Sequence, residues 1–545
     1  MEKMAHFFNF KTSGKTWLNK ELLGLISILL LGFFLRIYKI KDYITFLGDE
    51  GRDVLVVYNI LHGDLTLLGP TSSVGGFFLG PVYYYLMTPF LWLFRYDPVG
   101  PAIMVVLFGL ATIYLVYRMG KEFFGLKAGF IASFLYAISP VVVIYSRSSW
   151  NPNVFPFFTI ASFYALYKGV SKNNPVLFVL AGILMGINLQ IHYLATFVGA
   201  IMFFYVLLVI SNHKLSGLLE LLKRYVLMFL GFVIGFSPFL LFEIRHGFPN
   251  TFNILRFIFC SGETNFKFPF CTENVPLIAT GPTVDFATHV NQVFMRLFGG
   301  LILALPTPDK FWKYNDHVVN LWHILSFGLG LAAIAFFIYM FIKKRPDKKE
   351  YQKYLLIFLW GLLGIGLFGF YKKSIYDYYL GFLFPLPFLL VGFLFSTIAE
   401  KLKAYGVVLI GALLIILAYI HITNNPINVP GNQQVNQMKI ISDFVVSKTN
   451  GEPFNFGLIT GGNSDHAYRY FLKLEKRDPV VILSPDVDPE RKSVTNQLFV
   501  VCETLPCAPE GHSLWEIAGF GRAQITDEWE VSVVKIYRLE HYEGE

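Results

Sequence analysis

The chain has 545 residues, of which 54% are hydrophobic, 17% are aromatic and only 15% are charged. Together with a mean hydropathy of +0.53, this composition excludes an ordinary soluble domain and predicts a polytopic α-helical membrane protein. The net charge of +8 does not require a nucleic-acid partner, because cytoplasmic loops that face anionic lipid explain the basic residues. The sequence also contains no Walker loop, dinucleotide fingerprint, HExxH motif or paired CxxC motif, which argues against an intracellular nucleotide-sugar enzyme.

Eleven apolar windows reach or approach the length of about 20 residues that a transmembrane helix needs. The first window continues into Arg36 and Lys39 without a small-residue cleavage site, so it predicts a retained helix rather than a removed signal peptide. We therefore expect a membrane domain over residues 1–420 with about eleven transmembrane helices. The windows are Leu22–Ile40, Val99–Tyr117, Ala128–Tyr145, Val154–Tyr167, Val176–Leu189, Leu194–Ile210, Tyr225–Phe242, Val318–Ile342, Leu355–Phe370, Leu380–Phe395 and Ala404–Ile420.

A further apolar run, Phe77–Phe94, decides the topology. If it lies flat outside the membrane, the cytoplasmic segments hold twenty Lys and Arg residues, including the dense cluster at Lys343–Lys353. If it crosses the membrane, that cluster lies outside, against the rule that positive charge stays inside. We interpret Pro81–Phe94 within this run as an exterior interfacial helix. The N-terminus is then cytoplasmic and the C-terminus outside, with long exterior loops at 41–98 and 243–317 in a plasma-membrane protein.

The four cysteines all fall on the exterior side in this topology, where disulfides form. Their close spacing predicts the pairs Cys260–Cys271 and Cys502–Cys507, with unpaired thiols as the alternative.

Residues 421–545 change composition and predict an exterior soluble α/β domain. The turn Gly461–Asp465 could hold an anion at a helix start, but a plain helix-capping loop is favoured. The expected elements are helices at Gln434–Lys448 and Asp465–Lys476, and strands at Phe454–Thr460, Val480–Leu483, Gln497–Cys502 and Val531–Leu539.

An acidic pair, Asp49 and Glu50, follows directly on the first apolar window. Charged residues so close to a membrane mark a functional site by default. Asp49 could accept a proton from a bound hydroxyl, or the pair could bind a divalent metal ion such as Mg, Mn or Zn. The alternative is that both acids only solvate a helix end.

The order of features around this pair resembles the GT-C glycosyltransferases of the protein O-mannosyltransferase and aminoarabinose-transferase type. A basic N-terminus and first helix precede the exterior Asp-Glu pair, and a Gly-Pro-rich segment with Tyr83-Tyr84-Tyr85 and a cytoplasmic Phe124–Gly129 turn follow. The resemblance covers roughly residues 20–400. It implies a hexosyl- or pentosyltransferase that moves a sugar from a polyprenyl-phosphate donor to a protein, glycolipid or polysaccharide acceptor outside the cell, with inversion. In that family the exterior Asp is the general base, which corresponds to Asp49, with Glu50 as orienting partner or metal ligand.

The resemblance also shows two departures. Related enzymes often carry an Asp shortly after the Arg that corresponds to Arg147, whereas this chain has Asn151 and Asn153. A second carboxylate, and any metal that it would bind, are therefore in doubt. A Lys before the Pro of the interfacial helix is replaced by Gly80.

Donor phosphate contacts are expected from exterior cations, because Arg in particular suits phosphate recognition. Snorkelling interfacial bases are the alternative. The donor candidates are Arg147, Arg245, His246, Lys372 and Lys373, and the candidates for sugar or acceptor binding are Arg52, Asp53, Gln190, His192 and Tyr83. Gln190 and His192 could equally form a satisfied polar cluster at a helix end.

Two rival functions stay open at this point. A transporter or flippase of lipid-linked saccharides would place ionisable groups near the bilayer midplane and often shows inverted repeats, which are not evident here. A non-catalytic membrane assembly protein is the other alternative. The sequence does not specify the sugar, the carrier, the acceptor or the oligomeric state.

Overall fold

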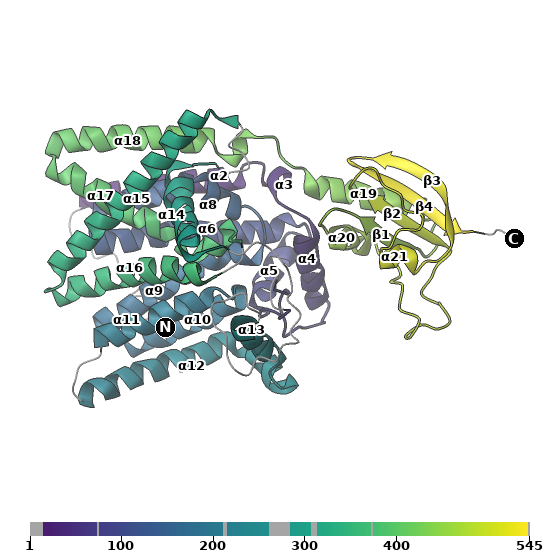
Figure 1. Cartoon of the computed structure of the whole chain (residues 1–545), viewed down its shortest axis with the longest axis horizontal. Coiled ribbons are helices and arrows are strands. Elements are labelled where there is room, and N and C mark those ends of the chain that lie inside the picture. The colour runs from purple at the N-terminus through teal and green to yellow at the C-terminus, as the bar shows by residue number, and fades with distance from the viewer. Residues whose placement is uncertain are drawn as a thin grey trace.

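The computed structural model describes residues 15–72, 76–210, 215–260, 284–306, 313–371 and 374–542. Most of its helices form a bundle, and a small module that contains a β-sheet sits at one end of this bundle (Figure 1). The helices α3, α4 and α5 lie at the same end as this C-terminal module (Figure 1).

The helical part follows the apolar windows of the sequence, and each of the eleven windows coincides with a helix or a helix pair. The N-terminal helices are α2 (Lys15–Ile37), α3 (Ile40–Tyr43), α4 (Gly48–Leu61), α5 (Val82–Leu93), α6 (Val99–Phe124), α7 (Leu126–Ile138), α8 (Pro140–Tyr145), η2 (Asn151–Val154), α9 (Phe155–Lys172), α10 (Pro175–Ile191), α11 (Ala195–Ile210) and α12 (Leu215–His246). The later helices are α13 (Pro249–Cys260), α14 (Phe286–Met295), η3 (Arg296–Ile302), α15 (Asp316–Lys344), α16 (Lys348–Gly366), η5 (Leu367–Phe370), η6 (Asp377–Leu383), α17 (Pro385–Lys401), α18 (Lys403–Thr423) and η7 (Pro426–Asn428).

Fewer helices are long and apolar enough to cross a membrane than the number of apolar sequence windows indicates. Among the described helices, α6, α12, α15, α16 and α18 are long and apolar enough to cross a membrane, and the bent pair η6 and α17 is a sixth candidate. The helices α7, α10 and α11 are apolar but shorter. A multi-helix membrane fold is therefore confirmed, whereas the predicted count of eleven crossings is not.

Two glycine pairs let α10 and α12 approach closely. Gly182 and Gly186 on α10 face Gly231 and Gly235 on α12, and a Cβ atom at Gly186 would lie 2.6 Å from the carbonyl oxygen of Phe232. Both pairs have the four-residue spacing that favours close helix contact in membranes. This packing fixes the position of α10 against α12. The C-terminal end of α10 lies at the same end of the bundle as α5.

The predicted interfacial segment forms α5, which is packed into the protein rather than lying free. Tyr83, Tyr84, Met87 and Leu91 are buried, whereas Trp92 is exposed. The helix contacts α4, α6 and α10. The basic turn between α15 and α16 lies at the opposite end of the bundle, away from α5 and the C-terminal module (Figure 1).

The C-terminal module is built around a four-stranded mixed sheet with the order β1-β2-β4-β3. β1 and β2 are parallel, and the other two pairs are antiparallel. The α/β prediction is thereby confirmed in outline. Its elements are α19 (Gln434–Lys448), β1 (Asn455–Ile459), α20 (His466–Leu474), β2 (Gln497–Cys502), α21 (Trp515–Ala518), β3 (Ala523–Val531) and β4 (Val534–His541).

The strand predictions for this module contain one error and one omission. Val480–Leu483 is not a strand, although the Val480 N–H donates to the Phe454 carbonyl at 2.9 Å. The last predicted strand, Val531–Leu539, corresponds to β4 and the turn before it, whereas β3 was not predicted. Apolar residues do alternate along β3 at Ala523, Ile525, Trp529 and Val531, but Asp527 interrupts this alternation beside the register shift between Ile525 and Asp527.

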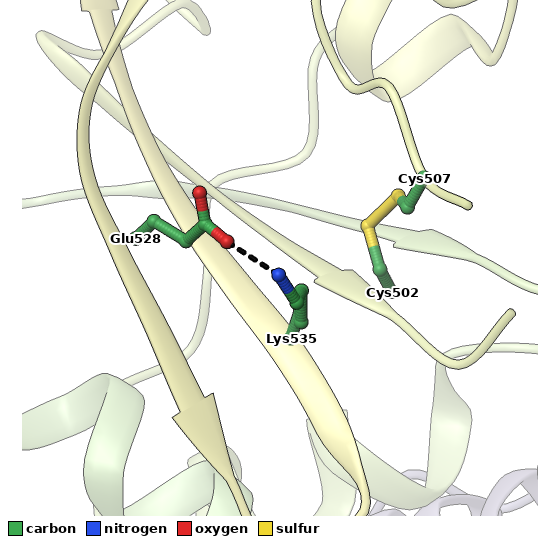
Figure 2. The surroundings of a disulfide bond; sticks show 4 residues. All are labelled: Cys502, Cys507, Glu528 and Lys535. Carbon is green, nitrogen blue, oxygen red and sulfur yellow. Dashed lines mark hydrogen bonds and ion pairs between the residues drawn. A yellow bond between two sulfur atoms is a disulfide. The ribbon is translucent and has the colours of Figure 1, made fainter. Parts of the chain in front are cut away.

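One predicted disulfide is confirmed. Cys502, at the end of β2, is bonded to Cys507, and Figure 2 shows this bond near the ion pair of Lys535 and Glu528 at 2.7 Å. The other predicted pair, Cys260–Cys271, includes Cys271, which lies outside the described residues.

The module and the bundle meet where α4 lies against α20. A Cβ atom at Gly51 would be 2.5 Å from the Cα atom of Ala467, and one at Gly48 would be 2.9 Å from the Ser464 nitrogen. Phe46 packs edge-on against Phe471, with ring centroids 5.6 Å apart. The glycines beside the acidic pair therefore serve this close backbone contact.

Replacement of Gly51 by alanine is expected to separate the two surfaces. Overpacking of a close contact costs about 1–3 kcal/mol, so the Gly51→Ala protein should unfold at a lower temperature in detergent. Gly411→Ala is the matched control, because a Cβ atom at Gly411 meets nothing within 4 Å. Equal unfolding temperatures for the two variants would contradict this interface.

Candidate active site

A cavity of about 680 Å³ opens at the junction of α4, the segment after α8 and the C-terminal module. It brings together three predicted site residues, Asp49, Glu50 and Arg147, although Arg147 lies about 100 residues further along the chain. The lining residues are Tyr43, Thr45, Leu47, Gly48, Asp49, Glu50, Ile144, Tyr145, Arg147, Ser148, Trp150, Asn153, Pro426, Gly462, Asn463 and Ser464.

Asp49 lies in the first turn of α4, and 55% of its side chain is exposed. Arg52 Nη1 donates a hydrogen bond to Asp49 Oδ1 at 2.8 Å. The same guanidinium donates through Nε and Nη2 to Oδ1 of the fully buried Asp53, at 3.0 and 2.7 Å. Arg52 thus fixes the position of the Asp49 carboxylate, and the buried Asp53 in turn fixes the position of Arg52.

Glu50 has a different environment from its neighbour, because only 8% of it is exposed. Its Oε2 accepts the Leu47 N–H at 3.1 Å and so caps the start of α4. Burial is the main cause that raises the pKa of Glu50 from 4.5 to about 7, and the charges of Asp53 and Asp49 add to it. This carboxyl is suited to orient the helix start rather than to carry a permanent negative charge.

Arg147 lies in the same cavity and is only 2% exposed. Its Nη2 donates to the Tyr38 carbonyl at 2.6 Å, and its guanidinium carbon lies 4.5 Å from the centre of the Tyr43 ring. Nε and Nη1 have no hydrogen-bond partner among the described residues. A buried guanidinium with two unpaired donors is suited to bind an anion.

A second cavity of about 650 Å³ shares Tyr145 and Trp150 with the first one. It contains Arg296, which forms an ion pair with Asp377. Sequence reasoning did not select Arg296, since the residue stands alone among apolar neighbours and carries no motif. The remaining lining residues are mostly apolar or aromatic and include Val141, Met295, Leu301, Leu305, Tyr376, Tyr378, Leu380 and Phe384.

Several predicted sugar-binding residues line neither of these two cavities. Tyr83 is buried, with its hydroxyl 2.8 Å from Ser149 Oγ. Gln190 Nε2 donates to the Gly235 carbonyl at 2.6 Å, and His192 is buried against the Phe155 ring. Direct sugar contact by these side chains is not supported, because all three are buried and line neither cavity. Gln190 and His192 lie together at the end of α10, but this cluster is not fully satisfied, since Gln190 Oε1 has no hydrogen-bond partner among the described residues. Arg52 and Asp53 do not line the cavity. Arg52 instead forms hydrogen bonds with both Asp49 and Asp53.

The remaining predicted phosphate ligands are not brought to Arg147. Arg245 and His246 lie exposed at the C-terminal end of α12, and His246 Nδ1 contacts the Phe242 carbonyl at 2.9 Å. Neither residue lines the two cavities above. Lys372 and Lys373 lie outside the described residues.

The described residues add no further metal ligands to the predicted pair of Asp49 and Glu50. Within the described ranges, no group of three or more His, Cys, Asp or Glu side chains could hold a metal ion. Moreover, Asp49 is ion-paired with Arg52, and Glu50 caps α4. These two residues do not form a metal site on their own.

The wall of the cavity opposite α4 comes from the turn before α20, at Gly462, Asn463 and Ser464. The sequence favoured a helix-capping loop here, but Asp465, the N-cap residue of α20, makes no side-chain cap hydrogen bond. Asn463 Oδ1 accepts the Ser464 N–H at 2.9 Å. It also accepts the Gly48 N–H at 2.8 Å. This hydrogen bond joins residues that are 415 positions apart in the chain, and no local sequence pattern could have indicated it.

The fold has counterparts among known proteins. Residues 79–242 match the family model described as dolichyl-phosphate-mannose-protein mannosyltransferase. The chain resembles the structure of ArnT from Cupriavidus metallidurans in the apo state, with a TM-score of 0.60 and 12% identity over 96% of this chain and 98% of that chain. The structure of ArnT bound to undecaprenyl phosphate gives a TM-score of 0.58 at the same identity and coverage.

The archaeal oligosaccharyltransferase AglB from Archaeoglobus fulgidus, in complex with an inhibitory peptide and a dolichol-phosphate, is also similar. Its TM-score is 0.50, with 14% identity over 89% of this chain and 69% of that chain. No curated protein sequence matches the chain. The family-model match and these structural likenesses confirm the resemblance drawn from the sequence: the chain has the fold of the GT-C membrane glycosyltransferases.

The buried Glu50 leads to a pH-dependent stability. Because its pKa is about 7 in the folded protein and about 4.5 when exposed, the stability that it contributes is present at pH 4.5 and is lost as the pH rises through 7. Glu50→Gln, which stays neutral, should therefore gain stability relative to the wild type between pH 5 and pH 8, by up to about 3 kcal/mol.

Chemical denaturation of the purified protein at both pH values measures this difference. Glu490→Gln, which removes a carboxylate that is 70% exposed, is the matched control and should behave like the wild type. A constant difference between Glu50→Gln and wild type at pH 5 and pH 8 would show that Glu50 does not titrate in this range.

Proposed function

We propose that the protein is an integral-membrane glycosyltransferase that transfers a sugar from a polyprenyl-phosphate donor to a hydroxyl-bearing acceptor outside the cell. The observation that carries this proposal is the meeting of Asp49, a half-exposed carboxylate, and Arg147, a buried cation with unpaired donors, in one cavity. Such a pair supplies the two groups that the reaction needs, a base for the acceptor and a cation for the leaving phosphate.

Asp49 accepts the proton of the acceptor hydroxyl as the hydroxyl oxygen attacks the anomeric carbon. Arg147 stabilises the negative charge that develops on the departing lipid phosphate. A single displacement of this kind inverts the anomeric centre. Arg52 and Asp53 keep the Asp49 carboxylate in place during the reaction, because their ion pairs leave Arg52 little freedom to move.

The apolar cavity beside the site suits the isoprenoid end of the donor. It adjoins the site cavity at Tyr145 and Trp150, so a phosphate near Arg147 could continue into an apolar chain. The ligands named for the similar structures, undecaprenyl phosphate with ArnT and dolichol-phosphate with AglB, support a polyprenyl phosphate as the carrier class here.

The charge distribution supports an exterior site in the plasma membrane. The basic cluster at Lys343–Lys353 lies at the turn between α15 and α16. This turn is at the end of the bundle opposite α4 and the C-terminal module (Figure 1), and α4 and the module contribute residues to the cavity. Because Lys and Arg accumulate on the cytoplasmic side, Asp49 and the C-terminal module then lie outside. A protein, glycolipid or polysaccharide acceptor can reach them there.

The Asp49→Asn variant tests the role of the base. We expect sugar transfer from radiolabelled polyprenyl-phosphate sugars to fall by about 10²- to 10⁴-fold, the usual contribution of a general base. Asp64→Asn, on the exposed segment after α4, should keep the wild-type rate. Retained transfer by purified Asp49→Asn would remove Asp49 from the mechanism, and movement of the intact donor across liposomes without cleavage would favour a transporter.

A second pair of variants tests the phosphate contact. Arg147→Gln should lower kcat/KM for the lipid-linked donor by about 100-fold, because one charge-stabilising donor set is lost. Arg245→Gln removes an exposed Arg that does not line the cavity, so we expect only a small change. Equal losses in the two variants would contradict the assignment of the phosphate to Arg147.

A further inference from the structure

We infer that Asn463 and Glu503, both in the C-terminal module, are positioning residues that fix the first turn of α4 and thereby place Asp49. The inference rests on the proposed function, in which Asp49 is the base. It assigns to the C-terminal module a part in catalysis that requires no contact with the substrate.

Asn463 bridges the module and the helix. Its Oδ1 accepts the Gly48 N–H at 2.8 Å and the Ser464 N–H at 2.9 Å. Its Nδ2 donates to Glu503 Oε1 at 3.0 Å and to Oε2 at 3.3 Å. The side-chain amide therefore uses both its acceptor and its donor, and the direction of each hydrogen bond is fixed by the backbone N–H groups on one side and the carboxylate on the other.

Glu503 is itself fixed by two further donors. Tyr468 OH donates to Oε1 at 2.8 Å, and Thr460 Oγ1 donates to Oε2 at 2.6 Å. Its backbone N–H donates to the Ile459 carbonyl at 2.9 Å, which continues the pairing of β1 and β2. Glu503 directly follows Cys502, whose disulfide is drawn in Figure 2. The position of Asn463 is therefore determined by the end of the sheet.

The contact acts at the residue before Asp49. The Gly48 N–H is one of the N–H groups at the start of α4 that have no partner within the helix. The preceding N–H, that of Leu47, donates to the Glu50 side chain. Two side chains, one from each part of the protein, thus hold adjacent amides of the turn that carries the base. A displacement of about 1 Å at a reacting group can cost about 10²-fold in rate.

A reversal of the hydrogen bond tests this inference. Asn463→Asp keeps an acceptor for Gly48 but places a carboxylate against Glu503, so the bridge should break. Adding Glu503→Gln in the same chain supplies an amide donor for the new carboxylate and should re-form the bridge with its direction reversed. Asn436→Asp, on the exposed face of α19, is the matched control for the amide-to-acid change.

Two measurements on the full-length protein in detergent are needed. Hydrogen exchange followed by mass spectrometry reports the protection of the peptide that contains residues 47–51. Sugar transfer reports kcat and KM. For Asn463→Asp we expect faster exchange in this peptide and a kcat reduced by about 10- to 100-fold, with the KM for the donor nearly unchanged. The double variant should recover both properties, and Asn436→Asp should change neither.

Unchanged exchange in Asn463→Asp would overturn the inference, because the turn would then not depend on the bridge. Faster exchange with an unchanged kcat would also overturn it, since the bridge would then be structural only. If the wild type transfers no sugar while the exchange pattern follows the expected order, the proposed function fails and the catalytic role of the bridge fails with it, although the physical link between Glu503 and α4 stands.

Discussion

The close contact between α4 and the start of α20 is the constraint on which the site depends. Without side chains at Gly48 and Gly51, the backbone of α4 can lie directly against Ser464 and Ala467. This contact places the first turn of α4, which carries Asp49, beside the cavity. It also brings Gly462 and Ser464 into the opposite wall of the cavity. The acidic pair is thus held by two parts of the chain that are more than 400 residues apart.

Charge is distributed unevenly within this site. On the α4 side, Arg52 connects Asp49 to the buried Asp53, so the negative charges are partly compensated. On the other side, Arg147 is buried without a carboxylate partner among the described residues. A buried charge without a partner is unfavourable, so binding of an anionic group beside Arg147 would remove a penalty as well as add an attraction. In the proposed function, this asymmetry favours a substrate that brings its own negative charge.

The sequence predicted the helices well, because eleven apolar windows produce a strong signal and each is helical in the structure. It also singled out Asp49, Glu50 and Arg147, charges beside apolar segments that the structure places around one cavity. It did not reveal that Gly48 and Gly51 allow a close contact with the start of α20. A glycine in the sequence does not indicate whether a ligand or another part of the backbone lies against it. Nor did it place Gln190 and His192, because burial depends on tertiary packing that a single chain pattern does not contain. Asn463 and Arg296 were missed for the same reason.

In the proposed mechanism, one cavity holds the donor phosphate beside Arg147 and within reach of Asp49. A cryo-electron microscopy structure of the protein with a bound polyprenyl phosphate would show where the phosphate lies. We expect phosphate density within hydrogen-bonding distance of Nε or Nη1 of Arg147, on the side of the cavity that faces Asp49, with the isoprenoid chain leaving past Tyr145 and Trp150. Phosphate density beside Arg245, or in any place remote from Arg147, would contradict it.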